Sequence, residues 1–209
     1  MKVISFCGFK GGTGKTTLAV NCCRYLYYYE QHKVSMLHFD PHQVLSSLAV
    51  TQACPFNIEA IKFGEIDEEL LGNYEYHDFL IVDCPSAFSA EYLPMLQLVD
   101  VIIVPFLYTV LDYYKLLAFG QVLAKLGIDF KKVVLLPNFY SERLCKDSQT
   151  EKLIKGAPML GNLRVMPGIP RNKPMANLQL GNLVPTELNN IRPAFIKIIH
   201  ILDILTSNI

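Results

Sequence analysis

The fold is decided by the stretch Gly8-Phe9-Lys10-Gly11-Gly12-Thr13-Gly14-Lys15-Thr16-Thr17. It follows Val3-Ile4-Ser5-Phe6-Cys7, which is typical of a buried strand, and it precedes Leu18–Cys23, which predicts the start of a helix. Glycines let backbone N–H groups turn toward an anion, and the N-terminus of a helix adds partial positive charge. A strand, a glycine-rich loop, a lysine and a helix in this order predict a site for a nucleotide triphosphate.

The residue types in the loop predict their roles. Lys15 would neutralise the β- and γ-phosphates, and the Thr16 hydroxyl would bind Mg²⁺. The alternative is a glycine-rich turn that binds nothing, but four glycines, two lysines and three threonines between a strand and a helix argue against it. The candidate nucleotide-binding residues of this loop are Gly11, Gly12, Thr13, Gly14, Lys15, Thr16 and Thr17.

Further apolar runs predict the rest of the sheet. The expected strands are Val34–Phe39, Phe79–Asp83, Val101–Pro105 and Lys132–Pro137. These runs are continuously apolar, which is typical of parallel strands covered on both faces. Helical patterns lie between them, at Lys15–Gln31, from the polar stretch after Pro41 through Ala60, at Glu65–Leu71 and at Leu111–Leu126. The sequence therefore predicts a doubly wound α/β fold with a mostly parallel sheet and helices on both faces, in one domain spanning residues 1–209.

Two carboxylates follow predicted strands. Asp40 comes after the strand that ends at Phe39, and Asp83 ends the strand that begins at Phe79. A lone Asp at a strand end usually belongs to a turn or caps a helix. Beside a phosphate-binding loop, however, both Mg²⁺ and the attacking water require carboxylates near the γ-phosphate. Asp40 and Asp83 are therefore candidate metal-site residues together with Thr16.

Composition limits the partners and the location. Lys+Arg and Asp+Glu both number 19, so any DNA-binding surface must be a local patch. The six cysteines show no metal-ligand spacing, which predicts free and mostly buried thiols in a cytoplasmic protein. Because no apolar run reaches the roughly 18–20 residues of a membrane span, we expect no integral membrane association.

The core Lys10-Gly11-Gly12-x-Gly14-Lys15-Thr16-Thr17 resembles the deviant Walker A loop of the ParA/MinD family of ATPases. Its mark is a second lysine at the start of the loop, here Lys10, and Phe9 stands where a strict P-loop has glycine. The short chain looks most like the small plasmid-partition ParA proteins, close to the ParF subgroup. This resemblance implies the P-loop NTPase fold, Mg²⁺-dependent ATP binding and slow, partner-stimulated ATP hydrolysis with Lys10, Lys15 and Asp40 as the catalytic residues.

Two further segments resemble the switch segments of that family. Phe39-Asp40-Pro41, followed by Gln43, is similar to switch I, where Asp40 would position the hydrolytic water. His38 stands where the family has a first Asp, and His42 is inserted before the Gln, so the rate of hydrolysis is left open. Asp83-Cys84-Pro85 resembles the Walker B end and switch II, with Asp83 reaching Mg²⁺ through water.

Three weaker matches lie later in the chain. Asp112 matches an acidic residue that can face the signature lysine across a dimer. Asn138 and the segment Ile169-Pro170-Arg171 resemble the adenine contacts of the family, which makes Asn138 and Pro170 candidate cofactor-binding residues. The alternative for Asn138 is a helix cap, because an Asn at the end of a strand also caps helices.

The resemblance implies an ATP-bound homodimer in which Lys10 of one subunit reaches the phosphates of the other, as an arginine finger does. Such dimers coat nucleoid DNA nonspecifically, and a centromere-binding, ParB-like partner stimulates hydrolysis and releases them. A patch of a few cations suffices for phosphate contacts, although a solvated face is the alternative. The candidate cations are Arg164, Arg171, Lys173, Arg192 and Lys197.

Other functions of the same family are open alternatives. A MinD-like ATPase that positions a cargo at the membrane surface would need a basic amphipathic C-terminal helix. The predicted last helix, Pro193–Leu205, has one lysine and a broad apolar surface, so we expect it to pack on the sheet. An iron–sulfur relative would need cysteines that bridge a dimer, and a tyrosine autokinase would need tyrosines after Tyr140, where the chain has none.

Overall fold

A computed structural model describes residues 1–39, 44–62, 65–86, 94–145, 148–171, 180–181 and 185–206. The strands are β1 (Lys2–Phe6), β2 (Val34–His38), β3 (Asn57–Ala60), β4 (Phe79–Asp83), β5 (Val101–Phe106), β6 (Val133–Pro137) and β7 (Arg164–Val165). The helices are α1 (Lys15–Tyr28), α2 (Val44–Thr51), α3 (Glu68–Gly72), α4 (Met95–Leu98), α5 (Val110–Lys125), α6 (Glu142–Cys145), α7 (Gln149–Gly156) and α9 (Pro185–Thr206), with a 3₁₀ turn η1 at Phe130–Lys132.

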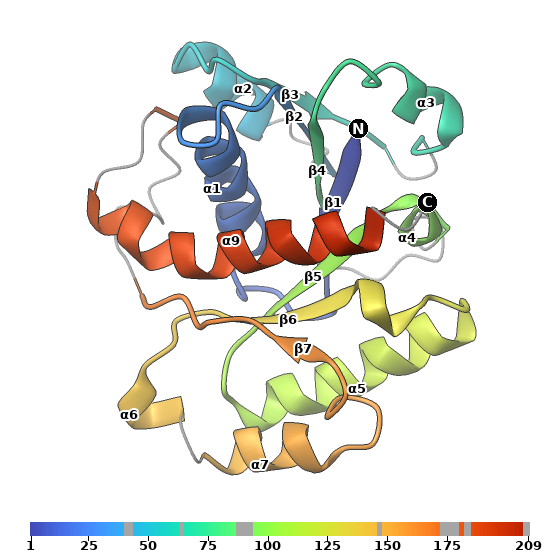
Figure 1. The fold of residues 1–209 in the computed structure, drawn as a ribbon, viewed down its shortest axis with the longest axis vertical. Helices are drawn as coiled ribbons and strands as arrows, with labels where there is room; N and C mark the ends of the chain where they lie inside the picture. Colours follow the sequence, from blue (N-terminus) through green and yellow to red (C-terminus); the bar gives the residue numbers. More distant parts are fainter. Residues whose placement is uncertain are drawn as a thin grey trace.

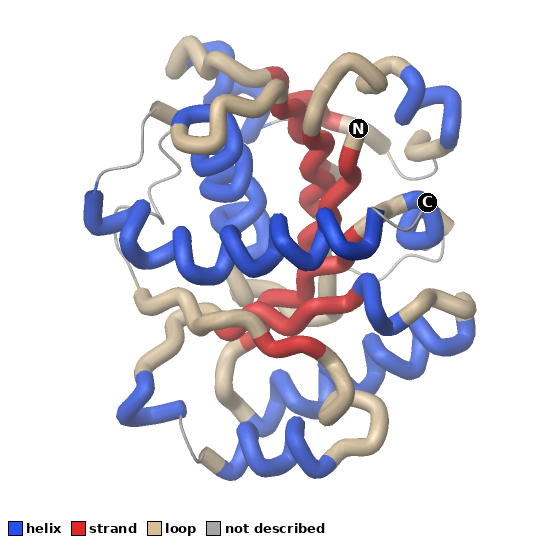
Figure 2. The backbone as a smooth tube through the Cα atoms, in the orientation of Figure 1, coloured by secondary structure: helices blue, strands red, loops and turns tan. Residues whose placement is uncertain are grey.

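The strands form one sheet in the order β3-β2-β4-β1-β5-β6-β7, and every pair in it is parallel. Figure 1 shows the helices wrapped around this sheet, and Figure 2 shows the strands gathered through the middle of the molecule. The predicted doubly wound α/β architecture is confirmed. The four predicted central strands and the strand before the glycine-rich loop all occur, with ends that differ by one residue at most.

The core has one layer on each face of the sheet. On one face, Ile4, Phe6 and Met36 pack with residues of α1 and α9. On the other, Val3, Leu80 and Val104 pack with residues of α5 and α7. Successive residues of a strand point to opposite faces, so continuously apolar strands fill both layers. This arrangement fixes the carboxyl ends of β1 and β4 side by side, and the candidate site lies there.

Two strands were not expected. Residues 57–60 were predicted to end a helical region, but they form β3, an edge strand that pairs with β2. Its residues alternate between exposed and buried, and only Ile58 is buried in the core. β7 has two exposed residues and no apolar run, so no periodic signal marks it.

The last helix packs on the sheet as predicted, but it begins earlier. α9 starts at Pro185, and Pro193 lies inside it. The buried side chains of Ile191, Ala194 and Phe195 continue one apolar stripe past the proline. Packing of this stripe against α1 outweighs the loss of one backbone hydrogen bond at Pro193. Among the described residues, no helix is both long enough and apolar enough to cross a bilayer.

Candidate nucleotide site

The glycine-rich loop joins β1 to α1 at the carboxyl edge of the sheet. Gly12 and Gly14 have φ values of 75° and 90°, which residues with a Cβ rarely adopt. A Cβ on Gly14 would also lie 2.3 Å from Nδ2 of Asn138. Gly14 precedes α1 with no side-chain cap, and the first turn carries no acid. The amides of this turn and the helix dipole therefore face the space where the loop would hold an anion.

Lys15 is held over the loop by two neutral acceptors. Its Nζ donates to the backbone oxygen of Lys10 at 2.9 Å and to Oγ of Ser86 at 2.8 Å. The residue is buried, and burial lowers the pKa of its amine below the ordinary value of 10.5, while the nearby Asp83 carboxylate raises it. A desolvated ammonium with only neutral hydrogen-bond acceptors is well suited to receive phosphate oxygens.

Thr16 and Asp83 meet at the predicted metal position. The Thr16 hydroxyl donates to Oδ2 of Asp83 at 2.7 Å. β4 pairs with β1 in a register that sets Phe6 opposite Asp83, and this register delivers the carboxylate to the loop. A hydroxyl and a carboxylate are the hard oxygen donors that Mg²⁺ prefers, so these two side chains fit a magnesium ion.

In the part of the chain that the structure describes, no cluster of side chains completes the ligand shell of a magnesium ion. Among the described residues, no group of three or more His, Cys, Asp or Glu could hold a metal. Mg²⁺ commonly binds proteins through one or two side chains and takes its other ligands from water and substrate phosphates. Asp40, the third predicted metal residue, lies outside the described residues.

A cavity of about 270 Å³ opens above the loop. Its walls include Gly12, Gly14, Thr17, Phe39 and Ser86, together with the Lys15, Thr16 and Asp83 side chains described above. Five of the seven predicted phosphate-loop residues and Asp83 thus line one hollow, and Gly11 and Thr13 are not among its lining residues. The cavity is polar at the loop and apolar at Phe39, which suits a charged phosphate chain beside less polar groups.

Lys10 makes its ion pair within its own chain. Its Nζ contacts Oδ2 of Asp112, the acid predicted to face it across a dimer. Asp112 is buried and also accepts from the Thr109 hydroxyl and from the Leu107 backbone N–H. Within this single chain, Lys10 therefore pairs with α5, where Thr109 caps the helix and orients Asp112. The contact between Asp112 and Lys10 across a dimer stays a prediction.

Asn138 supports the loop. Its Nδ2 donates to the Thr13 carbonyl at 2.8 Å, and its Oδ1 accepts from the Phe139 N–H at 2.9 Å. The adenine contact suggested by resemblance stays a prediction, since this amide already serves the loop. The capping alternative is wrong for α6, which begins four residues later at Glu142.

The Pro170 segment lies beside Asn138. Ile169 bridges to Asn138 in parallel fashion, which brings Pro170 and Arg171 to the edge of β6. The Arg171 guanidinium lies over the Phe139 ring, 5.7 Å from its centroid. Phe139 has a φ of 50° and an exposed ring. Whether Pro170 contacts a base is untested and stays a prediction.

Switch I is only partly described. His38, the last residue of β2, is buried, and its Nε2 lies 2.7 Å from Oγ of Ser46 on α2. Asp40, Pro41, His42 and Gln43 lie outside the described residues, so the water-positioning role of Asp40 stays a prediction. The side chain that replaces the first Asp of the resembled motif thus contacts α2 rather than the cavity.

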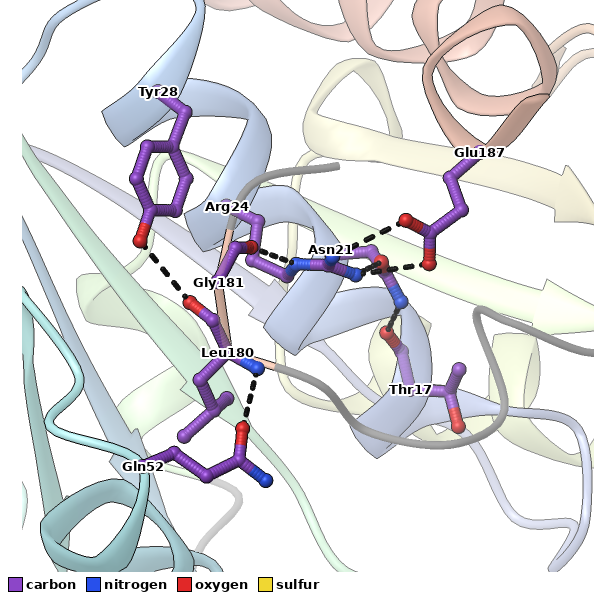
Figure 3. A network of polar contacts seen from close by, with 8 residues as sticks. All are labelled: Thr17, Asn21, Arg24, Tyr28, Gln52, Leu180, Gly181 and Glu187. Carbon is purple, nitrogen blue, oxygen red and sulfur yellow. Dashed lines mark hydrogen bonds and ion pairs between the residues drawn. The ribbon is translucent and has the colours of Figure 1, made fainter. Parts of the chain in front are cut away.

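Sequence reasoning missed two features of the site. The first is Ser86, three residues after Asp83, whose contact with Lys15 no spacing rule indicates. The second is a buried network behind the loop, shown in Figure 3. Asn21 donates to the Thr17 carbonyl at 2.7 Å and accepts from Arg24, which forms a bidentate pair with Glu187 of α9. The available signal was Arg24, an arginine about two helical turns beyond the loop.

Comparisons with known proteins agree with this geometry. Residues 4–184 match the family described as the CobQ/CobB/MinD/ParA nucleotide binding domain. Over 47 residues the chain is 45% identical to the virulence plasmid ParA family protein pGP5-D of Chlamydia psittaci, a stretch covering 22% of this chain and 18% of that protein.

Two solved structures share the fold over nearly their whole length. A protein of Borrelia burgdorferi B31 named for plasmid partition and bound to AMPPNP has a TM-score of 0.66 and 16% identity, covering 100% of this chain and 99% of that one. The septum site-determining protein MinD of Pyrococcus horikoshii OT3, complexed with Mg-ADP, has a TM-score of 0.64 and 20% identity, covering 99% and 97%. At these identities the likeness shows the fold.

Proposed function

The chain belongs to the CobQ/CobB/MinD/ParA nucleotide-binding domain family, and on that premise we propose that it is an ATP-dependent dimerisation switch of the ParA type. It hydrolyses ATP, binds DNA nonspecifically as an ATP-bound homodimer and partitions plasmid or chromosomal DNA in the cytoplasm, on the nucleoid. The observation that carries this proposal is the pair of lysines in the loop: Lys15 lines the cavity, and Lys10 pairs with Asp112 in a neighbouring hollow of the same loop.

ATP binding follows from the loop. Backbone amides from Gly11 to Thr17 surround the phosphates, and Lys15 exchanges its two neutral acceptors for phosphate oxygens. Thr16 and Asp83 hold Mg²⁺, which neutralises charge on the phosphates. Asp40 orients the attacking water. The solved relatives bound to AMPPNP and Mg-ADP support nucleotide and magnesium binding in this fold.

Dimerisation follows from Lys10. Its side chain is partly exposed, so it can leave Asp112 and reach a phosphate held by a second subunit. A cation supplied across the interface stabilises the charge that develops on the transferred phosphoryl oxygens. The γ-phosphate then links nucleotide state to dimerisation, which gives a two-state switch.

The DNA surface is proposed on the exposed cations of the last quarter. Arg164, Arg171, Arg192 and Lys197 are exposed, whereas Lys173 lies outside the described residues. Glu187 does not offset their charge, because it is fully buried against Arg24. A few phosphate contacts per subunit, doubled in a dimer, give salt-dependent nonspecific binding. A ParB-like centromere-binding protein is the proposed stimulating partner.

The test is co-sedimentation of the protein with plasmid DNA in the presence of ATP, ADP or no nucleotide. The proposal expects ATP-dependent binding that Arg171→Glu weakens and that Lys152→Glu, on the exposed face of α7, leaves nearly unchanged. DNA binding that is absent with ATP, or equal with and without it, would count against the ParA-type function.

A MinD-like ATPase acting at a membrane surface is the second candidate, and the similarity to the Pyrococcus horikoshii MinD structure favours it. Against it stands α9, whose apolar stripe is used in the core. ATP-dependent binding to anionic liposomes, together with no binding to DNA, would select this candidate over partition.

A further inference from the structure

Ser86 lines the nucleotide cavity, but the roles proposed above for the loop and for the metal residues do not use its hydroxyl. It lies three residues after Asp83, which ends β4, and it is exposed. We propose that the Ser86 hydroxyl binds the terminal phosphate of ATP and thereby distinguishes a nucleoside triphosphate from a diphosphate. This inference rests on the proposed function as an ATP-binding switch and adds a specificity-determining residue to it.

The backbone before Ser86 fixes it beside the start of the phosphate loop. Cys84 donates its backbone N–H to the Phe6 carbonyl at 3.0 Å, which ties this segment to the end of β1. Pro85 follows, and its ring restricts the φ angle of the residue that leads into Ser86. A Cβ built on Gly11 would lie 3.7 Å from Oγ of Ser86, which is an ordinary van der Waals distance. The hydroxyl therefore lies next to Gly11 of the loop.

The contact with Lys15 indicates which phosphate Ser86 would meet. Nζ of Lys15 lies 2.8 Å from Oγ of Ser86. In a phosphate-binding loop, the backbone amides cradle the α- and β-phosphates, and the lysine reaches the β- and γ-phosphates. Mg²⁺ bridges oxygens of the same two groups, and the residues that fit it here, Thr16 and Asp83, line the same cavity. The γ-phosphate is therefore the group that lies within reach of Ser86.

The hydroxyl of Ser86 has a proton available for that phosphate. A serine hydroxyl donates one hydrogen bond and accepts through two lone pairs. Here it accepts from Lys15, and within the described ranges no acceptor takes its proton. An oxygen of the γ-phosphate can accept this proton while Lys15 turns to the phosphates. A hydrogen bond to an anionic oxygen is charge-assisted and is stronger than one between neutral groups.

The neighbouring ammonium group argues against Ser86 as a magnesium ligand. A cation 2.8 Å from Oγ repels a metal ion at that oxygen and attracts a phosphate to it. Thr16 differs, because its hydroxyl contacts the Asp83 carboxylate, an anion that attracts Mg²⁺. The two hydroxyls of the cavity therefore suit different parts of Mg-ATP, the metal at Thr16 and the γ-phosphate at Ser86.

The proposal makes a distinct prediction for the two nucleotides. ADP lacks the γ-phosphate, so removal of the Ser86 hydroxyl should weaken the binding of a triphosphate and leave the binding of ADP nearly unchanged. The alternative is that Ser86 only holds Lys15 in the empty site. Its removal would then release Lys15 and change the affinities for both nucleotides by the same factor.

The test is isothermal titration calorimetry of the full chain with AMPPNP and with ADP, each with Mg²⁺. Ser86→Ala should weaken AMPPNP binding about 10-fold or more and should change ADP binding less than about 2-fold. Ser86→Thr keeps the hydroxyl and should bind AMPPNP within about 2-fold of the wild type. Ser47→Ala is the matched control, because Ser47 is exposed on α2 and is not among the residues that line the cavity. Circular dichroism melting of each variant verifies that the fold is retained.

The same titrations in a Lys10→Ala background, in which the proposed switch stays monomeric, separate the phosphate contact from dimerisation. The inference is overturned if Ser86→Ala changes both affinities by the same factor, or if Ser86→Thr binds AMPPNP as weakly as Ser86→Ala. It is also overturned if the loss of AMPPNP affinity is absent in the Lys10→Ala background. A wild type that binds neither nucleotide would overturn the proposed function as well, whereas equal effects in a protein that binds both would overturn this inference alone.

Discussion

Two ion pairs flank the helix that carries the phosphate loop, and they differ in burial and geometry. Arg24 pairs with Glu187 of α9, with both side chains fully buried and N–O distances of 3.1 and 3.2 Å in a bidentate arrangement. Lys10 pairs with Asp112 of α5, and the lysine side chain is 23% exposed. A rigid guanidinium that is hydrogen-bonded on all sides suits a permanent contact, whereas a flexible, partly exposed ammonium can change partners.

The two ion pairs have different roles: the pair of Arg24 supports the fold, and the pair of Lys10 belongs to the proposed switch. The Arg24 network, with its bonds to the Gly181 carbonyl and Asn21, holds α1 against α9 and the segment before it. The Lys10–Asp112 pair holds a side chain that, in the proposed switch, leaves Asp112 and contacts a phosphate bound by the second subunit. Buried charge therefore fixes the body of α1 against α9, whereas the ion pair in the loop before α1 can rearrange. Four substitutions test this difference, beginning with the largest expected effect.

Arg24→Ala should lower the free energy of unfolding by about 3–5 kcal/mol, because it leaves the Glu187 carboxylate buried without its partner. Urea denaturation followed by circular dichroism measures the loss. The double variant Arg24→Met with Glu187→Met should recover much of it, since a neutral apolar pair removes the buried charge. A loss below about 1 kcal/mol for Arg24→Ala would show that the pair is not a structural joint.

Lys15→Met should weaken ATP binding by about 100-fold or more, because charge-assisted hydrogen bonds to the phosphates are lost. Isothermal titration calorimetry measures the affinity. The nucleotide-free variant should be at least as stable as the wild type, since burial lowers the pKa of Lys15 and so penalises its charged form in the fold. Tight ATP binding by Lys15→Met would remove this residue from the site.

The pH dependence of the same variant gives an independent readout. Between the lowered folded pKa of Lys15 and its ordinary value of 10.5, the unfolded chain binds more protons than the folded one. Wild-type stability therefore gains from rising pH in that window, relative to Lys15→Met, whereas below it the difference between the two is constant. A difference that does not change with pH up to about 10.5 would contradict the burial argument.

Asn138→Ala should lower both stability and nucleotide affinity moderately. It removes the hydrogen bond to the Thr13 carbonyl inside the fold and loosens the loop, at a cost of about 1–3 kcal/mol. Asn162→Ala is the matched control, because its Nδ2 also donates to a backbone carbonyl, at 3.2 Å, but at the surface. Equal effects of the two substitutions would mean that Asn138 does not support the loop.

Lys10→Ala should change the free energy of unfolding least, by about 1 kcal/mol or less, because the pair is partly solvated and Asp112 keeps its other two donors. Lys2→Ala, which removes a more exposed Lys–Asp pair with Asp203, is the control for a surface ion pair. Thermal melting of both variants in the absence of nucleotide measures the effect. If Lys10→Ala greatly lowered the stability and Lys2→Ala did not, the Lys10–Asp112 pair would be a structural contact like the Arg24–Glu187 pair.

Local signals predict the parts of this molecule that depend on local physics. Continuous apolar runs such as Phe79–Asp83 predict buried parallel strands, and the order of glycines and lysines from Lys10 to Thr17 predicts the loop. Once β1 and β4 pair in their observed register, Asp83 at the end of β4 lies within hydrogen-bond distance of Thr16. β3 and β7 could not be predicted in this way, because short edge strands carry little apolar periodicity.

Contacts between side chains that are far apart in the sequence could not be predicted either. Ser86 reaches Lys15, and Glu187 reaches Arg24 across 163 positions in the chain. Resemblance pointed to Asp112 as a partner for Lys10 across a dimer but did not predict the ion pair that the two residues form within one chain. The sequence predicted that Asn138 contacts the adenine base or caps a helix. Neither prediction anticipated its hydrogen bond to the Thr13 carbonyl.

The most direct test of the switch is the mass of the protein with and without AMPPNP and Mg²⁺, measured by size-exclusion chromatography with light scattering. The wild type and Lys2→Ala should shift from monomer to dimer with AMPPNP. Lys10→Ala should bind the nucleotide with nearly wild-type affinity and stay monomeric, because it lacks the cation that reaches across the interface. A Lys10→Ala protein that dimerises with AMPPNP as the wild type does would contradict the account.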